Sequence, residues 1–405
     1  MLNIEQFIST HITKRSVSMF ASSVYNNQLA LYDKINNKSV LVIGGAGSIG
    51  SSFIKALLPF KPSKLVVADA NENALAELTR SIRSDFQLAS YVPREFLLYP
   101  IDYASSVFEK LFRNTGGFDV VANFSAHKHV RSEKDIYSIE ALIRNNLLNA
   151  RRLLDLLAEY SPESYFCVST DKAANPVNIM GASKRIMEDV ISSYSDYFPV
   201  KTARFANVAF SNGSLLDAFL KRIEKLQPLS APLDVRRYFV SPEEAGQICL
   251  LAAILGQNRE IFFPKLNEAQ MMRFDDIARQ LLQELGYSVL ECSSDKDAIK
   301  RSEELKFGGR EYPVHFSVSD TSGEKSFEEF VTDYEETDMK RFDSLGVIIN
   351  KPMPNKDKIN ALFANFETVF NGNKSTTKEE IVRLLTDYLP NFEHIETGKS
   401  LDSKM

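Results

Sequence analysis

The sequence predicts an α/β protein that is built on a doubly wound parallel sheet, with a smaller region towards the C-terminus. Short, β-branched apolar runs alternate with stretches of helical spacing, such as residues 141–160, through the first half of the chain. This alternation is typical of right-handed crossovers whose helices cover both faces of a parallel sheet. In addition, a glycine cluster directly follows the first apolar run, at the turn where such sheets bind ligands.

Composition excludes several classes of protein. The 405 residues correspond to two or three domains of roughly 100–200 residues. Lys and Arg total 48 against 53 Asp and Glu, and the resulting net charge of −5 disfavours non-specific nucleic-acid binding. The longest apolar run, 248–255, is too short to span a bilayer. We therefore expect a protein without a membrane span and without a nucleic-acid partner.

The N-terminus and the cysteines favour a cytoplasmic location. The first fifteen residues contain an early glutamate and no long apolar core, unlike a signal peptide. Cys167, Cys249 and Cys292 are far apart in the sequence and form no C-x-x-C pair. This spacing favours reduced thiols over a disulfide framework.

The individual elements follow from local patterns. The predicted strands are 39–43, 65–67, 96–98, 120–121, 165–168 and 202–205. Later helical spacing indicates helices near 214–226, 242–255, 275–285 and 377–389, the last with an N-cap at Thr376 or Thr377. Residues 290–360 are rich in charged and turn-forming residues, and no element is predicted there.

The glycine cluster predicts a site for a dinucleotide. Gly44, Gly47 and Gly50 form a Rossmann-type G-x-x-G-x-x-G motif. This motif directly follows the first strand and precedes a helix. The first glycine permits the turn, the second allows a pyrophosphate to approach the backbone, and the third allows close helix–strand packing. The helix N-terminus, with Ser48 and Ile49, supplies N–H donors to the phosphates.

Two acids follow the next two strands. Asp69 ends the second strand, where a carboxylate accepts hydrogen bonds from ribose hydroxyls and repels a 2′-phosphate. No arginine follows it directly, so we expect NAD rather than NADP. Asp102 follows the third strand and is a candidate adenine contact, although a helix N-cap or turn role is equally consistent with its position.

The fifth strand ends in a polar segment. Thr170, Asp171 and Lys172 lie beyond its carboxyl end, which is where ligands bind in parallel sheets. Met180 and Lys184 are four residues apart and share a helix face. An acid next to an amine can supply a general acid and a general base side by side, whereas a solvated surface ion pair is the alternative interpretation.

Three stretches resemble a known family. They are STDKAANPVNIMGASKR at 169–185, SAHKHV at 125–130 and RFANVAFSNGS at 204–214. The chain resembles, over about residues 39–285, the UDP-N-acetylglucosamine 4,6-dehydratase group of the extended short-chain dehydrogenase/reductases, which serve bacterial polysaccharide biosynthesis. The Thr-Asp-Lys-Ala-x-x-Pro segment is the most specific part. This chain has Met180 where the superfamily usually has tyrosine, and it keeps Lys184.

The resemblance implies roles for the catalytic segment. Asp171 would be the acid that protonates the departing C6 hydroxyl, and Lys172 the base that removes the C5 proton. Thr170 would hydrogen-bond the C4 oxygen, and Lys184 would bind the nicotinamide ribose. Met180 would form an apolar wall of the active site, because a thioether cannot carry a proton.

The resemblance also implies cofactor and substrate contacts. Ser125 and Ala126 would run along the cofactor. The expected substrate-binding residues are Lys128, His129, Asn207, Ser214, Arg236 and Arg237. Metal ligation by His127 and His129 is a weaker alternative, because no carboxylate–histidine cluster accompanies them, and no metal site is expected. Residues 209–211 depart from the family's usual Leu-Gly-Ser.

Together these features predict four regions and one function. Residues 1–38 would be a helical extension, 39–206 the NAD-binding domain, 207–290 a substrate-binding region, and 291–405 a lid or oligomer interface. The expected function is NAD-dependent 4,6-dehydration of a UDP-sugar, UDP-N-acetylglucosamine in the first place, by a homo-oligomer. The alternatives are a C5-inverting dehydratase or an epimerase on the same scaffold, or a non-catalytic NAD sensor, which would have no use for Thr170, Asp171 and Lys172.

Overall fold

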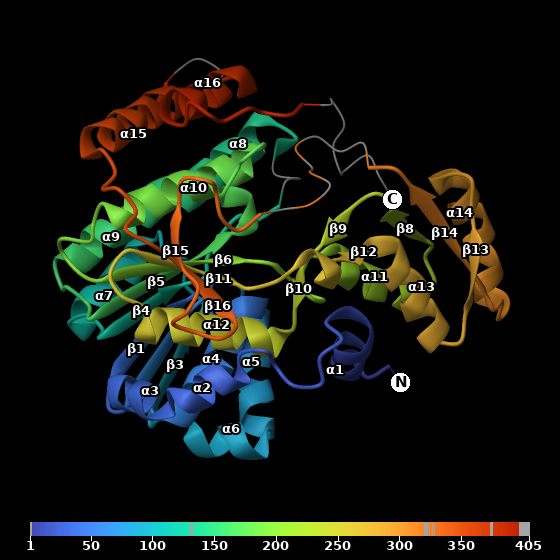
Figure 1. Cartoon of the computed structure of the whole chain (residues 1–405), viewed down its shortest axis with the longest axis horizontal. Helices are drawn as coiled ribbons and strands as arrows, with labels where there is room; N and C mark the ends of the chain where they lie inside the picture. Colours follow the sequence, from blue (N-terminus) through green and yellow to red (C-terminus); the bar gives the residue numbers. More distant parts are fainter. Residues whose placement is uncertain are drawn as a thin grey trace.

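The centre of the protein is a nine-stranded sheet with strand order β15-β16-β11-β6-β5-β4-β1-β2-β3 (Figure 1). The computed structural model describes residues 2–129, 133–319, 323, 325, 327, 329–372 and 376–396. The strands of this sheet are β1 (Ser39–Ile43), β2 (Lys64–Ala68), β3 (Glu95–Tyr99), β4 (Val120–Asn123), β5 (Ser164–Thr170), β6 (Val200–Phe205), β11 (Glu260–Pro264), β15 (Glu336–Asp338) and β16 (Leu345–Ile349).

The predicted doubly wound parallel sheet is confirmed. All six predicted strands form β1 to β6, and they pair in parallel with one another. Strand β1 lies between β2 and β4, so the direction of winding reverses there. The crevice beyond the carboxyl ends of the strands at this reversal is where doubly wound sheets bind ligands.

The sheet extends beyond the range 39–206 in which it was predicted. Strand β11 joins β6 in parallel, and β16 and β15 add two antiparallel pairings at that edge. These strands escaped prediction because β11 follows an apolar helix after only a short turn. The other two lie in a charged stretch with no regular alternation of strands and helices.

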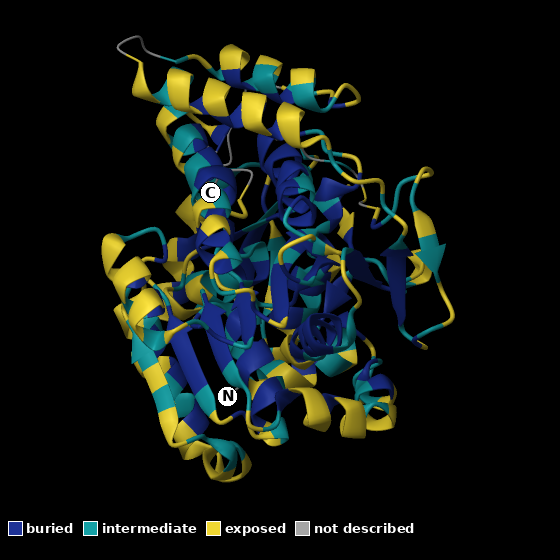
Figure 2. Ribbon diagram, turned by 90° about the vertical axis from the view of Figure 1, so that its left-hand side faces the viewer, coloured by how far each residue is buried: buried dark blue, intermediate teal, exposed yellow. Residues whose placement is uncertain are grey.

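Helices cover both faces of the sheet. On β1, Val40 and Val42 belong to one apolar core, and Leu41 and Ile43 to the other, as alternation along a strand requires. The first face carries α2 (Ala21–Asn26), α3 (Gln28–Ile35), α4 (Ser48–Leu57), α5 (Glu72–Ser84) and α12 (Pro242–Leu255). The second face carries α7 (Ser106–Thr115), α8 (Ile136–Ile143), the π-helical turn η4 (Arg144–Asn149), α9 (Ala150–Ala158) and α10 (Ile179–Ser192). Figure 2 shows the buried strands between these helical layers.

Helix α12 explains the longest apolar run of the sequence. It is buried along most of its length, and Ser241 and Glu244 form a capping box at its N-terminus. A Cβ atom on Gly246 would lie 2.3 Å from the carbonyl oxygen of Ser52, so α12 and α4 approach closely. The run is therefore a core helix. Within the described part of the chain, no helix is long and apolar enough to cross a membrane.

A smaller lobe lies beside the large sheet (Figure 1). Its parallel sheet has the order β13-β14-β8 and packs against helices that include the N-terminal turn. Its elements are α1 (Ile4–Phe7), α11 (Leu215–Glu224), β8 (Leu229–Pro232), α13 (Phe274–Glu284), β13 (Ser288–Glu291), α14 (Asp295–Arg301) and β14 (Glu311–Ser317). Two short pairs connect the lobes: β7 (Asn207–Val208) with β10 (Phe239–Val240), and β9 (Arg236–Arg237) with β12 (Met272–Arg273).

Two C-terminal helices complete the structure. Helix α16 (Lys378–Tyr388) matches its prediction, and Thr377 and Glu380 form its capping box. Helix α15 (Lys356–Asn371) was not predicted, although Phe363 and Phe366 pack in the core of the second face. In Figure 1 both helices lie over the layer that contains α8, α9 and α10.

Candidate active site

The glycine turn has the geometry of a phosphate-binding loop. Gly44 has φ = +70°, and a Cβ atom there would lie 2.7 Å from the backbone nitrogen of Ser125. A Cβ atom on Gly50 would lie 2.5 Å from the carbonyl oxygen of Gly44, so this glycine brings α4 against the turn. Gly47 is the N-cap of α4, and Ser48 is its first residue. The free N–H groups of this helix end therefore face the crevice at the point of reversal.

Asp69 lies beside this turn at the end of β2. Its carboxylate accepts hydrogen bonds from the backbone N–H groups of Ala46 at 3.0 Å and Asn71 at 2.9 Å. Asp102 is exposed and accepts from the backbone N–H of Ala104 at 2.9 Å, just before α7. Asp69 is thus joined directly to the glycine turn, whereas Asp102 stabilises a turn of its own.

The end of β5 brings the predicted acid and base together. Asp171 is 4% exposed, so the pair with Lys172 is not a solvated surface ion pair. One carboxylate oxygen of Asp171 accepts three hydrogen bonds: from the Thr170 hydroxyl at 2.7 Å, the Lys172 backbone N–H at 2.9 Å and the Lys172 ammonium at 3.2 Å. The three side chains form one hydrogen-bonded group at the carboxyl end of the sheet.

The first turn of α10 packs directly against this group. A Cβ atom on Gly181 would lie 2.7 Å from the carbonyl oxygen of Lys172. Met180 is 2% exposed, as an apolar wall would be, and Lys184 is 4% exposed. The Lys184 ammonium donates to the carbonyl oxygen of Val168 at 3.0 Å. Burial lowers the pKa of Lys184 below its ordinary value, and the neighbouring Cys167 and Glu188 oppose this shift only in part.

A buried asparagine positions the loop after β4. Asn146, on η4, accepts from the backbone N–H of His127 at 2.9 Å and donates to its carbonyl oxygen at 3.0 Å. It also donates to the Ser183 hydroxyl at 3.1 Å. Asn146 was not predicted from the sequence, because the helical segment around it contains several other polar residues, such as Arg144 and Asn149, and nothing distinguishes Asn146 from them.

The same loop carries the predicted cofactor and sugar contacts. The Ser125 N–H donates to the Asn123 side chain at 2.9 Å, and Ala126 follows it. Desolvation by the surrounding protein lowers the pKa of Lys128 below its ordinary value, and the negative charge of Asp217 acts in the opposite direction. The His129 ring lies within 3.1 Å of the position of a Cβ atom on Gly213. The loop after β4 therefore contacts the loop before α11. Val130, the last residue of the 125–130 motif, lies outside the described residues.

The remaining predicted contacts have different surroundings. Asn207 donates from its backbone N–H to the carbonyl oxygen of Tyr238 at 3.1 Å, and Ser214 is the N-cap of α11. Arg237 is 5% exposed and donates to the carbonyl oxygen of Lys325 at 3.0 Å. Arg236 is exposed and pairs with Glu268 at 3.1 Å, on the opposite side of β9. Of the two arginines, Arg237 is therefore buried and bonds backbone carbonyl oxygens, whereas Arg236 is exposed and bonds a carboxylate.

Comparison with known proteins identifies the family. A family model described as "Polysaccharide biosynthesis protein" matches residues 40–350. The chain belongs to this family. It is 27% identical to the probable polysaccharide biosynthesis protein EpsC of Bacillus subtilis over 279 residues, which cover 67% of this chain and 45% of EpsC. The chain thus spans about half the length of this relative.

Other proteins of similar sequence are named as dehydratases or epimerases. The chain is 28% identical to the UDP-N-acetylglucosamine 4,6-dehydratase (inverting) of Campylobacter jejuni over 63% of this chain and 74% of the relative. It is 25% identical to the UDP-glucose 4-epimerase of Rickettsia prowazekii over 87% of this chain and 90% of the relative. These matches confirm the predicted resemblance, since the relatives include a dehydratase and an epimerase that are named for UDP-sugars.

Solved structures support the fold. The X-ray structure of Pen from Bacillus thuringiensis is similar with a TM-score of 0.62 and 20% identity, and covers 82% of this chain and 98% of that chain. At this identity, the similarity establishes the shared α/β fold.

Proposed function

We propose that this chain catalyses the NAD-dependent 4,6-dehydration of a UDP-N-acetylhexosamine, with UDP-N-acetylglucosamine as the first candidate substrate. The product would be a 4-keto-6-deoxy sugar nucleotide for surface polysaccharide. The observation that carries this proposal is the buried Asp171 hydrogen-bonded to Lys172 at the carboxyl end of β5. The similarity to the Campylobacter dehydratase supports it.

The residues of the glycine turn fit a dinucleotide. The missing Cβ atoms of Gly44 and Gly50 keep the turn tight and the helix end close to it. Asp69 would accept hydrogen bonds from the ribose hydroxyls of the adenosine, and Lys184 would bind the nicotinamide ribose. When bound there, NAD would take up a hydride from the sugar and return it.

The side chains at the end of β5 would carry the proton transfers. Thr170 would donate a hydrogen bond to the C4 oxygen, which becomes a carbonyl and thereby acidifies the C5 proton. Asp171, as a carboxylate, would accept the C4 hydroxyl proton as the hydride leaves C4. Lys172 in its neutral form would then accept the C5 proton, and Asp171 would pass its proton to the C6 hydroxyl, which leaves as water. When the hydride returns to C6, Lys172 would give its proton back to C5. The hydrogen bonds among the three groups hold them at one place for these steps.

One residue distinguishes this proposal from a 4-epimerase. The superfamily tyrosine is replaced by Met180, which is buried and has no ionisable group. A 4-epimerase would need another proton carrier at that position and would have no use for the Asp171–Lys172 pair. A dehydratase that inverts C5 uses the same groups, and the experiment below reports that stereochemistry directly.

The experiment is incubation of the purified chain with UDP-N-acetylglucosamine deuterated at C4, followed by NMR. We expect a 4-keto-6-deoxy product with deuterium at C6. Lys172→Met and Asp171→Asn should each lower the rate by about 10²–10⁴-fold, whereas Met180→Leu should have a small effect. Stoichiometric NADH accumulation, or normal dehydration by Lys172→Met, would contradict the proposal. NAD binding without conversion of any sugar nucleotide would favour the sensor.

A further inference from the structure

Arg204, on β6, is the centre of a buried ionic cluster behind the catalytic segment. Its guanidinium is 0% exposed and uses all five N–H donors. It donates to Glu188 at 2.9 and 2.8 Å, to Glu335 at 2.7 Å twice, and to the carbonyl oxygen of Phe330 at 2.8 Å. Burial acts to raise the pKa of both carboxyl groups, but Arg204 outweighs it and holds each pKa below its ordinary value. Both carboxylates are therefore ionised.

Among the described residues, this cluster contains equal numbers of negatively and positively charged side chains. The carboxylates are Glu188, Asp189 and Glu335, and the cations are Arg185, Arg204 and Lys351. Arg185 lies 3.1 Å from Glu335, and Lys351 lies 2.9 Å from Asp189. Because the members are buried or nearly so, neutralising one carboxylate would leave a cation without full compensation.

The cluster contacts the catalytic segment through Ser169. This residue is 2% exposed, and its hydroxyl donates to the same Glu188 oxygen that Arg204 contacts, at 2.7 Å. Ser169 directly precedes Thr170 and Asp171 in the chain. The position of Glu188 therefore fixes the backbone from which the proposed acid projects.

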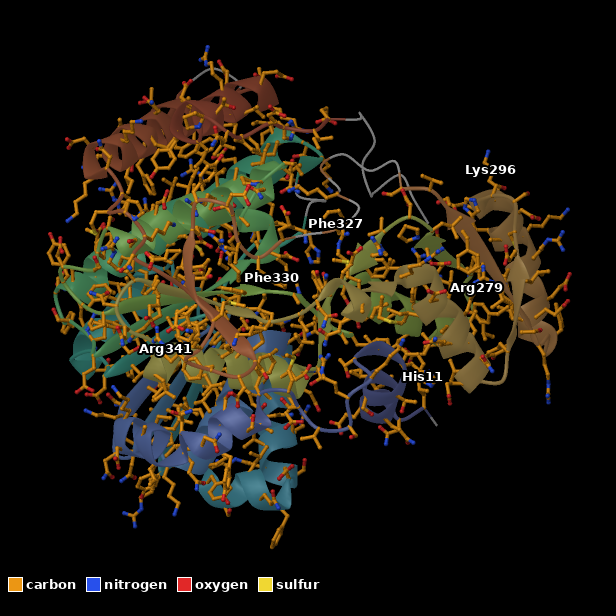
Figure 3. The ribbon with its side chains drawn as sticks, in the orientation of Figure 1. His11, Arg279, Lys296, Phe327, Phe330 and Arg341 are labelled. Atoms are coloured by element: carbon orange, nitrogen blue, oxygen red, sulfur yellow. The ribbon has the colours of Figure 1, made fainter. Side chains whose placement is uncertain are left out.

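A stretch of the C-terminal region, which we call the anchor segment (residues 329–335), supplies the other side of the cluster. Besides Glu335 and the Phe330 carbonyl group, it contains Glu329, which accepts from the Asn175 side chain at 2.9 Å. Asn175 lies just after the catalytic residues. The ring of Phe330, which is labelled in Figure 3, packs against Tyr238 with a centroid distance of 5.5 Å and belongs to the apolar core of the large sheet. The anchor segment is thus connected to the catalytic loop at two places. Before the catalytic residues the connection runs through the ionic cluster to Ser169, and after them it is the hydrogen bond to Asn175.

We propose that the anchor segment is part of the catalytic machinery, and that Glu335 is a positioning residue that acts on Thr170 and Asp171 through Arg204, Glu188 and Ser169. This inference rests on the proposed function. It assigns the C-terminal region a role in the reaction itself. Arg204, Glu188 and Ser169 lie between Glu335 and the catalytic residues, so its proposed effect is on the placement of the acid.

The test is Glu335→Gln, assayed for dehydration of UDP-N-acetylglucosamine by the otherwise unmodified chain. The glutamine keeps the size of the side chain but presents an amide donor to the Arg204 donors. Small displacements of catalytic groups cost up to about 10²-fold in rate, so we expect kcat to fall between about tenfold and a hundredfold. KM and NAD binding should stay within about twofold, because the site that binds the ligands is unchanged. Glu336→Gln, at the exposed neighbour that bonds Asn350, is the matched control and should behave like the unmodified chain.

A second variant keeps the test decisive if Glu335→Gln does not fold. Ser169→Ala removes only the hydroxyl that joins the cluster to the catalytic segment, and it should lower kcat with KM preserved. Where both variants fold, the double variant should lose little more than Ser169→Ala alone, because the two residues act along one route. A normal kcat per folded molecule in either single variant, or additive losses in the double variant, would overturn the inference and leave the dehydratase in place. An inactive unmodified chain would overturn both proposals.

Discussion

Lys201 provides a sharp test of the electrostatics in the sheet. It is the second residue of β6 and is only 4% exposed, at the end of the strand opposite to the active site. Its ammonium donates to the hydroxyl of Ser164 at 2.8 Å, and that hydroxyl donates in turn to the carbonyl oxygen of Ala253 at 2.6 Å. Burial lowers the pKa of Lys201 from 10.5 to about 8, with repulsion from Lys34 adding to it and Glu260 opposing it.

The size and sign of the effect follow from this pKa. A shift from 10.5 to about 8 means that the charged Lys201 destabilises the native state by about 3 kcal/mol relative to the unfolded state. Below pH 8, both the native and the unfolded states hold the proton, so the full cost is present. Between pH 8 and 10.5, the unfolded state binds the proton and the native state releases it. The contribution of this group to the free energy of unfolding therefore rises with pH across that window.

We expect Lys201→Met to stabilise the protein at pH 7 by up to about 3 kcal/mol. Ser164 keeps its bond to Ala253, so no buried donor loses its partner. Urea unfolding followed by circular dichroism at pH 7 and pH 10 gives the difference from the unmodified chain, which should shrink towards zero at the higher pH. Lys55→Met, at an exposed site on α4, should show no such trend. A destabilised Lys201→Met at pH 7, or a difference independent of pH, would refute the reasoning.

Two further predictions concern the cofactor site. Gly50→Ala would place a Cβ atom 2.5 Å from the carbonyl oxygen of Gly44. We therefore expect the free energy of unfolding to fall by about 1–3 kcal/mol and NAD to bind more weakly. Thermal unfolding and calorimetry test these two effects, and an unchanged NAD affinity would contradict the prediction. Asp69→Ala removes the carboxylate that disfavours a 2′-phosphate, so the preference for NAD over NADP should decrease in binding titrations; equal binding of both cofactors by the unmodified chain would contradict the assignment of NAD.

The parts of the fold that were predicted correctly have strong local signals. The strands β1 to β5 contain apolar runs with glycine or polar residues at their ends, and α12 combines a Ser241 cap, a proline at its start and an apolar body. Helix α16 carries its capping box in the sequence itself. Strand β16 is also a short apolar run, but it lies in a charged stretch, and its place between β15 and β11 depends on pairing with residues far away in the chain.

The same distinction applies to the candidate site. Thr170, Asp171 and Lys172 are consecutive, so a single motif places them together before any fold is known. Their surroundings are assembled from distant parts of the chain. Arg204 and Glu335 are separated by 131 residues and nevertheless share two hydrogen bonds.

Arg204 is a charged residue within the predicted strand 202–205, but no periodicity or spacing indicates that Glu335 is its partner. The need for a partner becomes visible only when β6 places Arg204 in the core, where a guanidinium must satisfy its five donors. A local motif can therefore identify the chemistry of this site. The residues that hold the chemistry in place follow from the packing of the C-terminal region against the sheet, and the Glu335 and Ser169 variants measure that contribution directly.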